Sequence, residues 1–296
     1  MTTNATTALP DFEKIWNFNK PAQTEAEFKQ ILPLATKSED LDYKLQLLTQ
    51  IARTQGLQRN FEEAHKTLDG VESLISKATP VAEIRYNLER GRVFNSSKKK
   101  EMALPLFKKS FDLAVAHKED NLAVDAAHMV AIAETDATKI MEWNLKALKL
   151  SEDSKNQKTQ DWQGSLYNNI GWTYHDSGKF TEALDMFTKA LAYRQKKGEA
   201  SSIRIAQWCV ARAYRSLNKL DESLQLQKSL EDEFNKLPDK DGYVFEELGE
   251  LYLLKKNNDK AKKYFALAYH EFSKDEGFKA NDAKRLARLK ELGQVK

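Results

Sequence analysis

The chain has 296 residues, of which 41% are hydrophobic and 31% are charged, a balance that excludes wholesale disorder. Lys and Arg number 47 against 44 Asp and Glu, so the net charge of +3 lacks the basic excess that is usual in nucleic-acid binders. The 11 glycines and 6 prolines are too few for a turn-rich strand fold and favour long helices with short connections.

Residues 1–20 are expected to form a flexible N-terminal segment. Its first part, Met1 to Pro10, lacks the basic and apolar regions of a secretory signal. No apolar run reaches the roughly 20 residues needed to cross a bilayer, and a lone cysteine cannot form an intramolecular disulfide. We therefore expect a cytoplasmic protein with no membrane partner.

Residues 21–44 are predicted to form an N-terminal helical segment. Its helix would cover Thr24 to Ala35, and Pro33 would bend or end it, because proline removes a backbone donor and clashes with the preceding turn.

Six helix pairs are then predicted between residues 45 and 275. The anchor positions of these pairs fall at residues 52, 91, 128, 171, 211 and 249, so that the repeat is 37 to 43 residues long. The predicted pairs cover residues 45–78, 84–117, 121–154, 164–197, 204–237 and 242–275.

The fourth and sixth of these ranges carry the same ladder of seven residue types at identical spacings. In the fourth range the ladder consists of Tyr167, Ile170, Gly171, Tyr174, Ala183, Phe187 and Ala190. In the sixth range it consists of Phe245, Leu248, Gly249, Tyr252, Ala261, Phe265 and Ala268. Positions three and four apart share one helical face, so each ladder describes a buried stripe on two successive helices. Gly171 and Gly249 would remove a side chain where the two helices cross closely.

This ladder resembles the tetratricopeptide repeat, with units longer than the standard length of about 34 residues. The resemblance implies an all-α fold, a right-handed superhelical solenoid of about six antiparallel helix pairs with a terminal capping helix. Residues 278–296 would supply that cap, because the pattern of Asn281 to Leu292 predicts an amphipathic helix. Without a cap, the last repeat would expose its apolar side. The alternative for this basic helix is contact with a membrane surface or a partner.

No catalytic or metal-binding motif accompanies the repeats. Phosphate-binding loops, paired Cys-x-x-Cys and His-Glu-x-x-His are all missing from the sequence. We therefore expect no enzymatic activity, no cofactor and no metal site. Cys209 is interpreted as an ordinary buried thiol, with a reactive cysteine as the alternative.

The resemblance also implies a binding surface, because the first helix of each tetratricopeptide pair faces a concave groove. Carried over to this sequence, the groove positions include Tyr243 and ten candidate peptide-binding residues: Arg53, Arg85, Arg92, Asn95, Asn168, Trp172, His175, Trp208, Arg212 and Arg215. Arginine offers a planar fork for carboxylates, and Trp and Arg dominate measured binding hot spots. The alternative is that the arginines form salt bridges with neighbouring helices and that the tryptophans belong to the core.

These features predict a non-enzymatic scaffold or adaptor that binds an acidic and apolar peptide segment of a partner protein in its groove. A first alternative is a helical repeat protein that binds nucleic acid, for which Lys98-Lys99-Lys100 is the densest basic run. A second is a structural, self-associating subunit whose groove is filled by its own termini or by a second copy. The bulk charge disfavours the first alternative, and the sequence leaves the oligomeric state open.

Overall fold

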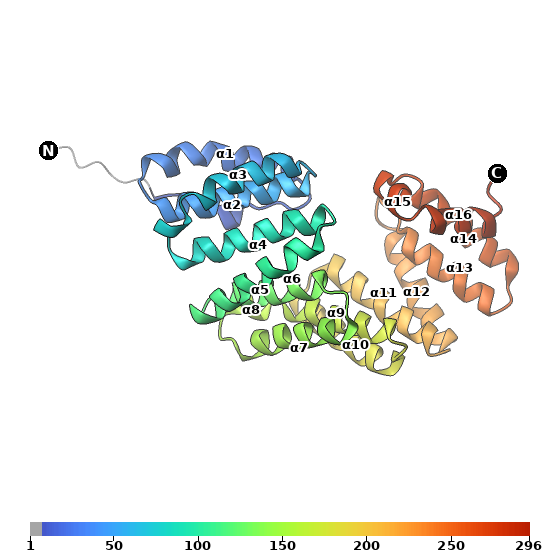
Figure 1. Cartoon of the computed structure of the whole chain (residues 1–296). Coiled ribbons are helices and arrows are strands. Elements are labelled where there is room, and N and C mark those ends of the chain that lie inside the picture. Colours follow the sequence, from blue (N-terminus) through green and yellow to red (C-terminus); the bar gives the residue numbers. More distant parts are fainter. Residues whose placement is uncertain (1–7) are drawn as a thin grey trace. The chain divides into compact units, whose positions relative to one another are not determined.

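The computed structural model describes residues 8–296, and within this range the chain is helical without any β-strand (Figure 1). The chain divides into two compact units, one ending at Trp162 and the other spanning Gln163–Lys296, which we call unit 1 and unit 2. The predicted all-α solenoid of antiparallel helix pairs is confirmed, and each unit is built from such pairs.

Unit 1 begins with a short 3-10 helix and a single α-helix, followed by three helix pairs. These first elements are η1 (Phe12–Ile15) and α1 (Pro21–Lys37). The pairs are α2 (Leu41–Leu57) with α3 (Phe61–Glu72), α4 (Pro80–Ser96) with α5 (Lys100–Ala116), and α6 (Asp120–Ala133) with α7 (Ala137–Asp153). Short connecting elements are η2 (Ile75–Lys77) and α8 (Gln157–Gln160).

Unit 2 contains three further pairs and two helices at its C-terminal end. The pairs are α9 (Gln163–Asp176) with α10 (Phe180–Lys197), α11 (Ala200–Ser216) with α12 (Leu220–Phe234), and α13 (Gly242–Leu254) with α14 (Asn258–Phe272). The last elements are α15 (Glu276–Asn281) and α16 (Ala283–Leu292). One pair lies on each of the six ranges predicted from the sequence, although α2, α4 and α11 begin four residues earlier than those ranges. Helix α16 packs on α14 through the fully buried Leu289, as a capping helix would.

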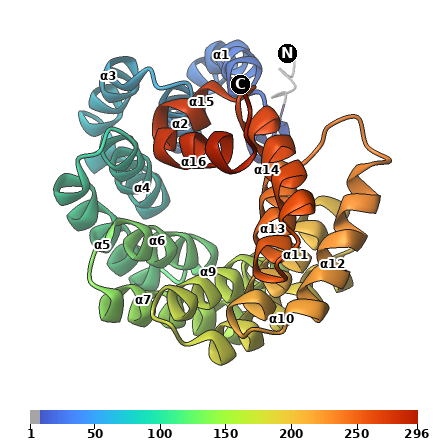
Figure 2. The same cartoon turned by 90° about the vertical axis from the view of Figure 1, so that its right-hand side faces the viewer.

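The first helices of the pairs, which we call the A helices, are α2, α4 and α6 in unit 1 and α9, α11 and α13 in unit 2. Within unit 1, α2 contacts α4 and α4 contacts α6, while α3, α5 and α7 lie on the other side (Figure 2). Within unit 2, α11 likewise contacts both α9 and α13. We call the surface formed by the A helices of each unit its A face.

Every turn within a pair is three residues long, and five of the six turns share one conformation. The middle residue adopts a left-handed φ in these five turns: Arg59, Lys98, Gly178, Asn218 and Lys256. The residue after it donates its N–H to a carbonyl five residues earlier, as Lys179 does to Tyr174 at 2.9 Å. This pattern is the Schellman motif, which ends a helix by satisfying its last carbonyls. The common turn therefore relates three pairs with weak sequence ladders, α2–α3, α4–α5 and α11–α12, to the two pairs with full ladders, whereas the turn between α6 and α7 differs.

A phenylalanine of the second helix packs directly over a glycine of the first helix in three pairs. The partners are Phe107 over Gly91, Phe187 over Gly171, and Phe265 over Gly249. A Cβ atom added at these glycines would lie 2.5, 2.5 and 2.7 Å from a ring carbon of the phenylalanine. The prediction that the glycines permit close helix crossing is confirmed.

The structure refines two expectations for the N-terminal region. Of the two effects expected of Pro33, a bend or an end of the helix, the end does not occur, because α1 continues to Lys37. Pro33 lies on the exposed side, where water can solvate the carbonyl that it leaves unpaired. Residues 8–20, the described part of the predicted flexible segment, contact the helices, since Phe12 is buried against Phe28 and Tyr43. Residues 1–7 of the predicted flexible segment lie outside the described residues.

Candidate peptide-binding surface

The A face of unit 1 carries a chain of alternating charges. Glu89 on α4 accepts hydrogen bonds from Arg53 at 3.2 Å and from Arg92 at 2.6 Å, and Arg92 also pairs with Asp125 on α6. Burial opposes the charge of Arg92, but Asp125 and Glu89 outweigh it and raise the pKa of Arg92. Burial likewise favours protonation of Asp125, but Arg92 and Arg53 hold the pKa of Asp125 below its usual value. These two arginines therefore tie neighbouring A helices together, which was the alternative interpretation of the sequence.

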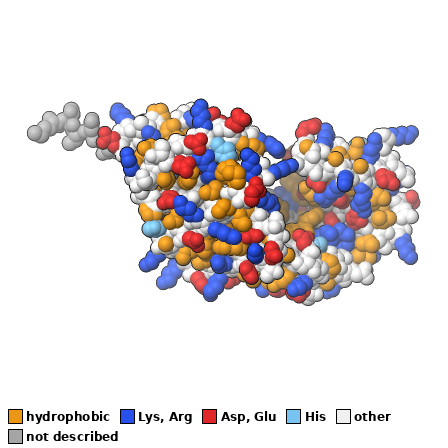
Figure 3. All heavy atoms as spheres, in the orientation of Figure 1, with side chains coloured by type: hydrophobic (Ala, Val, Ile, Leu, Met, Phe, Trp, Pro, Cys, Tyr) orange, Lys and Arg blue, Asp and Glu red, His pale blue; other side chains and the backbone are white. Residues whose placement is uncertain are grey.

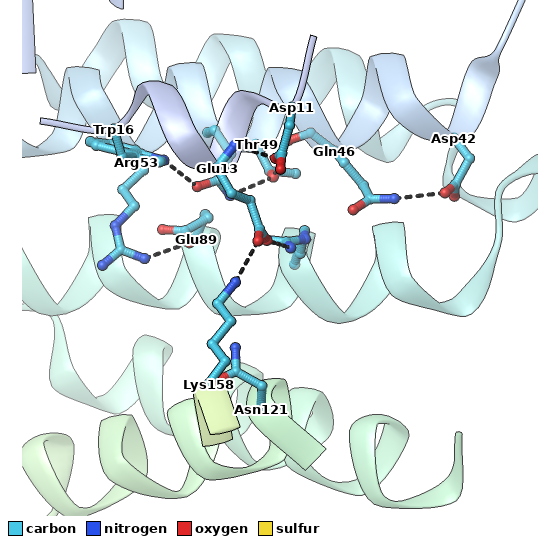
Figure 4. Close-up of polar contacts among 12 residues, drawn as sticks. Asp11, Glu13, Trp16, Asp42, Gln46, Thr49, Arg53, Glu89, Asn121 and Lys158 are labelled. Carbon is cyan, nitrogen blue, oxygen red and sulfur yellow. Dashed lines mark hydrogen bonds and ion pairs between the residues drawn. The ribbon is translucent and has the colours of Figure 1, made fainter. Parts of the chain in front are cut away.

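Arg85 is engaged by the N-terminal segment of the chain. Glu13 of η1 forms an ion pair with Lys158 on α8 (Figure 4). It forms a second ion pair with Arg85 on α4. Trp16 donates its indole N–H to Gln50 of α2 at 3.0 Å. Residues 11–18 thus lie across the A face of unit 1, and part of the predicted groove is occupied by the chain itself.

Asn95 is the remaining candidate in unit 1. It lies in the last turn of α4 and is partly exposed, and its Oδ1 atom is buried without a hydrogen-bond partner. No arginine among the candidates in this unit contacts it in the described residues, so the structure does not join Asn95 to the charged chain.

The A face of unit 2 is aromatic. Trp172 on α9, Trp208 on α11 and Tyr243 on α13 follow one another, with the ring centroids of both successive pairs 6.0 Å apart. They line a cavity of about 420 Å³ together with Asn168, Ser201, Arg204, Ile205, Cys209, Phe234, Asp241 and Val244. This volume lies within the range of about 300–1,000 Å³ that small-ligand pockets occupy. The structure therefore brings three of the predicted residues, Asn168, Trp172 and Trp208, into one site.

Two charged residues of this cavity were not among the predicted candidates. The guanidinium carbon of Arg204 lies 5.3 Å from the ring centroid of Phe234, and its Nε atom is buried without a hydrogen-bond partner among residues 8–296. Asp241 caps α13 by accepting hydrogen bonds from the N–H groups of Tyr243 and Val244. Burial raises the pKa of Asp241, although these backbone donors partly oppose it.

The sequence held a signal for Arg204 but none for its neighbours. Arg204 precedes Trp208 by four residues on α11, so helical spacing places both on one face. Phe234 is the last residue of α12, and Asp241 immediately precedes α13. Helical spacing places Phe234 on the face of the buried Leu230 but does not say which residues of other helices these two meet.

His175, Arg212 and Arg215 form a separate polar network at the C-terminal ends of α9 and α11. Arg215 donates two hydrogen bonds to Glu247 at 2.7 and 2.8 Å, and Arg212 lies 3.2 Å from the same carboxylate. His175 Nε2 is 2.9 Å from the hydroxyl of Ser216. Burial and the charge of Arg212 lower the pKa of His175, which favours a neutral ring. These three candidates hold α9, α11 and α13 together and leave no free guanidinium for a ligand carboxylate.

The C-terminal helix covers the acidic residues of α13. Arg285 of α16 donates to both carboxylate oxygens of Glu246 at 2.9 and 3.0 Å, and Arg288 pairs with Glu250 at 2.6 Å. The acidic part of the predicted groove is therefore neutralised by the chain's own last helix.

Cys209 is a structural thiol. Its Sγ donates to Asn168 Oδ1 at 3.3 Å, and burial raises the pKa of Cys209 to about 12. Over residues 8–296, His, Cys, Asp and Glu do not gather in any group of three that could hold a metal ion. The helices of the same range include none with the length and apolar character required to span a bilayer. On the visible surface of each unit, acidic and basic side chains are interspersed (Figure 3).

A tetratricopeptide repeat family model matches residues 164–197, which form α9 and α10. Solved structures that contain tetratricopeptide or similar repeats superimpose on most of the chain. The chain is a helical repeat protein of the tetratricopeptide type. Among curated proteins, none matches its sequence.

Three solved structures illustrate the similarity of this chain's fold to others. A signal-transduction ATPase with a tetratricopeptide repeat sensor from Pyrococcus horikoshii is 15% identical with a TM-score of 0.69, over 94% of this chain and 43% of that one. NprR in complex with its cognate peptide NprX is 14% identical with a TM-score of 0.57, over 96% and 85% of the two chains. A Rap protein complexed with competence and sporulation factor is 15% identical with a TM-score of 0.56, over 97% and 98%. At these identities the likeness concerns the fold alone.

Proposed function

We propose that this tetratricopeptide protein is a non-catalytic scaffold or adaptor that holds a peptide segment of a partner protein in the aromatic cavity of unit 2. One observation carries the proposal: Trp172, Trp208 and Tyr243, from three successive A helices, line a single cavity of about 420 Å³. Tryptophan and tyrosine are enriched among the residues that contribute most to binding energy. NprR, whose structure contains a peptide, has the same fold, which is consistent with this proposal.

The cavity favours an apolar side chain with a hydrogen-bond acceptor beside it. Its aromatic rings and the exposed Ile205 provide apolar contact area. Arg204 contributes a guanidinium that forms no ion pair within the described residues, although its charge acts on the Asp241 carboxylate and favours the ionised form. Asp241 itself accepts two backbone hydrogen bonds at the start of α13. An acidic residue or a peptide carbonyl next to the apolar side chain would therefore approach Arg204. The acidic preference rests on Arg204 rather than on Arg212 and Arg215, which are already paired with Glu247.

The decisive experiment is selection of ligands from a displayed peptide library, followed by calorimetry with the best peptide. Ile205→Glu places a charge in the cavity at a residue that is 56% exposed, so the fold should tolerate it. We expect this variant to bind at least about tenfold more weakly, since it replaces apolar contact by a carboxylate that must be desolvated. Leu145→Glu on α7, at a residue 45% exposed and outside the cavity, is the matched control and should bind normally.

Equal affinity of the Ile205→Glu variant and the unaltered protein would refute the cavity as the binding site. Arg204→Gln should weaken the binding of peptides that contain an acidic residue and leave the affinity for their neutral counterparts unchanged. The absence of any selected peptide, together with an RNA or DNA ligand whose affinity falls steeply with salt, would support the nucleic-acid alternative instead. The cytoplasm remains the compartment that we propose for this activity.

A further inference from the structure

We propose that unit 1 carries a second peptide site, on the A face between α2, α4 and α8, for a partner segment in which an aromatic residue follows an acidic residue by three positions. The chain displays such a ligand itself, because residues 11–18 occupy this surface with Glu13 and Trp16. The inference uses contacts within unit 1 only and does not depend on the cavity of unit 2.

The acidic position is recognised by two cations from different elements. The Glu13 carboxylate pairs with Arg85 of α4 through one oxygen and with Lys158 of α8 through the other. Burial favours protonation of Glu13, but the hydrogen bonds and charges of Lys158 and Arg85 outweigh it and hold the pKa of Glu13 below its usual value. Neither cation has a second carboxylate partner within the described residues, so this pair would be left unneutralised if the segment withdrew.

The aromatic position is recognised by Gln50 and Arg53 of α2. Gln50 accepts the indole N–H of Trp16, and Trp16 stacks on Phe18 with ring centroids 4.5 Å apart. The guanidinium carbon of Arg53 lies 5.7 Å from the Trp16 centroid and 5.2 Å from that of Phe18. Arginine packs on aromatic faces by cation–π attraction, so this part of α2 forms an amphipathic receptor for one or two rings.

The segment that fills the site is anchored by apolar side chains, whereas its acidic contact is partly exposed. Phe12 is buried, and the partly buried Ile15 and Trp16 pack on the same cluster around Phe28. Its only regular element is the four-residue η1. Glu13 keeps 37% of its side chain exposed and Phe18 is 57% exposed. Ion pairs at that exposure contribute little to stability. A partner segment with the same chemistry can therefore compete with residues 11–18, at an affinity reduced by the fraction of molecules in which the site is covered.

The test uses the full chain and a fluorescent peptide with the sequence of residues 9–20 as the probe. The double variant Glu13→Lys/Trp16→Ala should release the intramolecular segment and expose the site. We expect the peptide to bind this variant at least about tenfold more tightly than the unaltered chain, because the site is no longer covered. Glu13→Lys alone changes a partly exposed residue and should give an intermediate gain in peptide affinity. It keeps the test valid if the double variant does not fold.

Specificity is tested in the released variant. Adding Arg85→Gln should weaken binding of the natural peptide, whose acidic residue then pairs with Lys158 alone. A peptide that carries Glu13→Gln should bind about equally well with and without this change, since it has no charge to lose a partner. Adding Ile205→Glu should change nothing, so failure of the unit 2 cavity and failure of this site give different results. Equal peptide affinity for the unaltered and released chains, or no binding to either, would overturn the second site.

Discussion

The A faces of the two units are built on the same helix pairs but offer opposite chemistry. In unit 1 the surface is a chain of paired charges, centred on Glu89 and Arg92 and crossed by the N-terminal segment. In unit 2 the surface is a row of aromatic rings beside a cavity, with Trp172 and Trp208 at its centre. Both surfaces use equivalent positions of the A helices. The repeat therefore determines the scaffold, whereas the residues at a few A-helix positions determine what each unit can bind.

If the scaffold is common to both units, truncating the equivalent core phenylalanine should lower the free energy of unfolding by a similar amount in each unit. Phe107 and Phe187 are both fully buried over a glycine. We expect Phe107→Ala and Phe187→Ala each to lower the free energy of unfolding by about 3–5 kcal/mol, the usual cost of such a cavity. Denaturant unfolding measures both, with the exposed Phe18→Ala as the control. A large effect in one unit and a negligible one in the other would contradict the equivalence.

The next prediction distinguishes the charged networks. Glu89 is nearly buried and is shared by Arg53 and Arg92, whose side chains are 25% and 14% exposed. Glu89→Ala leaves both arginines without their central partner, so we expect a loss of about 3 kcal/mol. Glu246→Ala in unit 2 should cost only about 1 kcal/mol, because its partner Arg285 is 36% exposed and can be solvated. Thermal or chemical unfolding measures both variants. Similar losses of unfolding free energy in Glu89→Ala and Glu246→Ala would show that the two networks contribute equally to the stability of the fold.

A smaller effect is expected at the glycines beneath the phenylalanine rings. Gly91→Ala and Gly171→Ala place a Cβ atom 2.5 Å from a ring carbon, and overpacking of this kind costs about 1–3 kcal/mol. Gly70→Ala is the control, because no atom lies within 4 Å of its added Cβ and alanine is the better helix former. A stabilised Gly171→Ala protein would mean that the ring moves aside, and the ladder glycine would then be dispensable.

The sequence predicted the scaffold better than the sites, for a physical reason that particular residues illustrate. Gly171 and Phe187 contact each other within one hairpin, so local spacing was enough to predict their packing. The pair of Trp172 and Trp208 was also placed correctly on successive A helices by the repeat register.

Contacts between remote segments carry no such periodic signal. Glu13 reaches Arg85 across 72 positions of sequence, from a short 3-10 helix whose docking place depends on Phe12 and Tyr43. The ion pairs of α16 with α13 depend in the same way on how a terminal helix packs. Both terminal segments lie on A-face residues that the register alone would have left open to a ligand.

The smallest expected effect is a pH dependence of the N-terminal contact, which unit 1 should show through Glu13. The pKa of Glu13 in the folded protein lies below its ordinary value of 4.5, so its ion pairs stabilise the fold above pH 4.5 and lose this effect as the pH falls through the lower folded value. Because Glu13 is 37% exposed, the contribution should not exceed about 1 kcal/mol.

The measurement is the difference in unfolding free energy between the unaltered protein and Glu13→Gln, which should be present at neutral pH and vanish in acid. Ile205→Glu in unit 2 provides a chain with an intact Glu13 and should keep the same acid dependence. A Glu13→Gln difference that persists in acid would mean that the segment is held by its rings alone, and the charge would then have no part in covering the A face of unit 1.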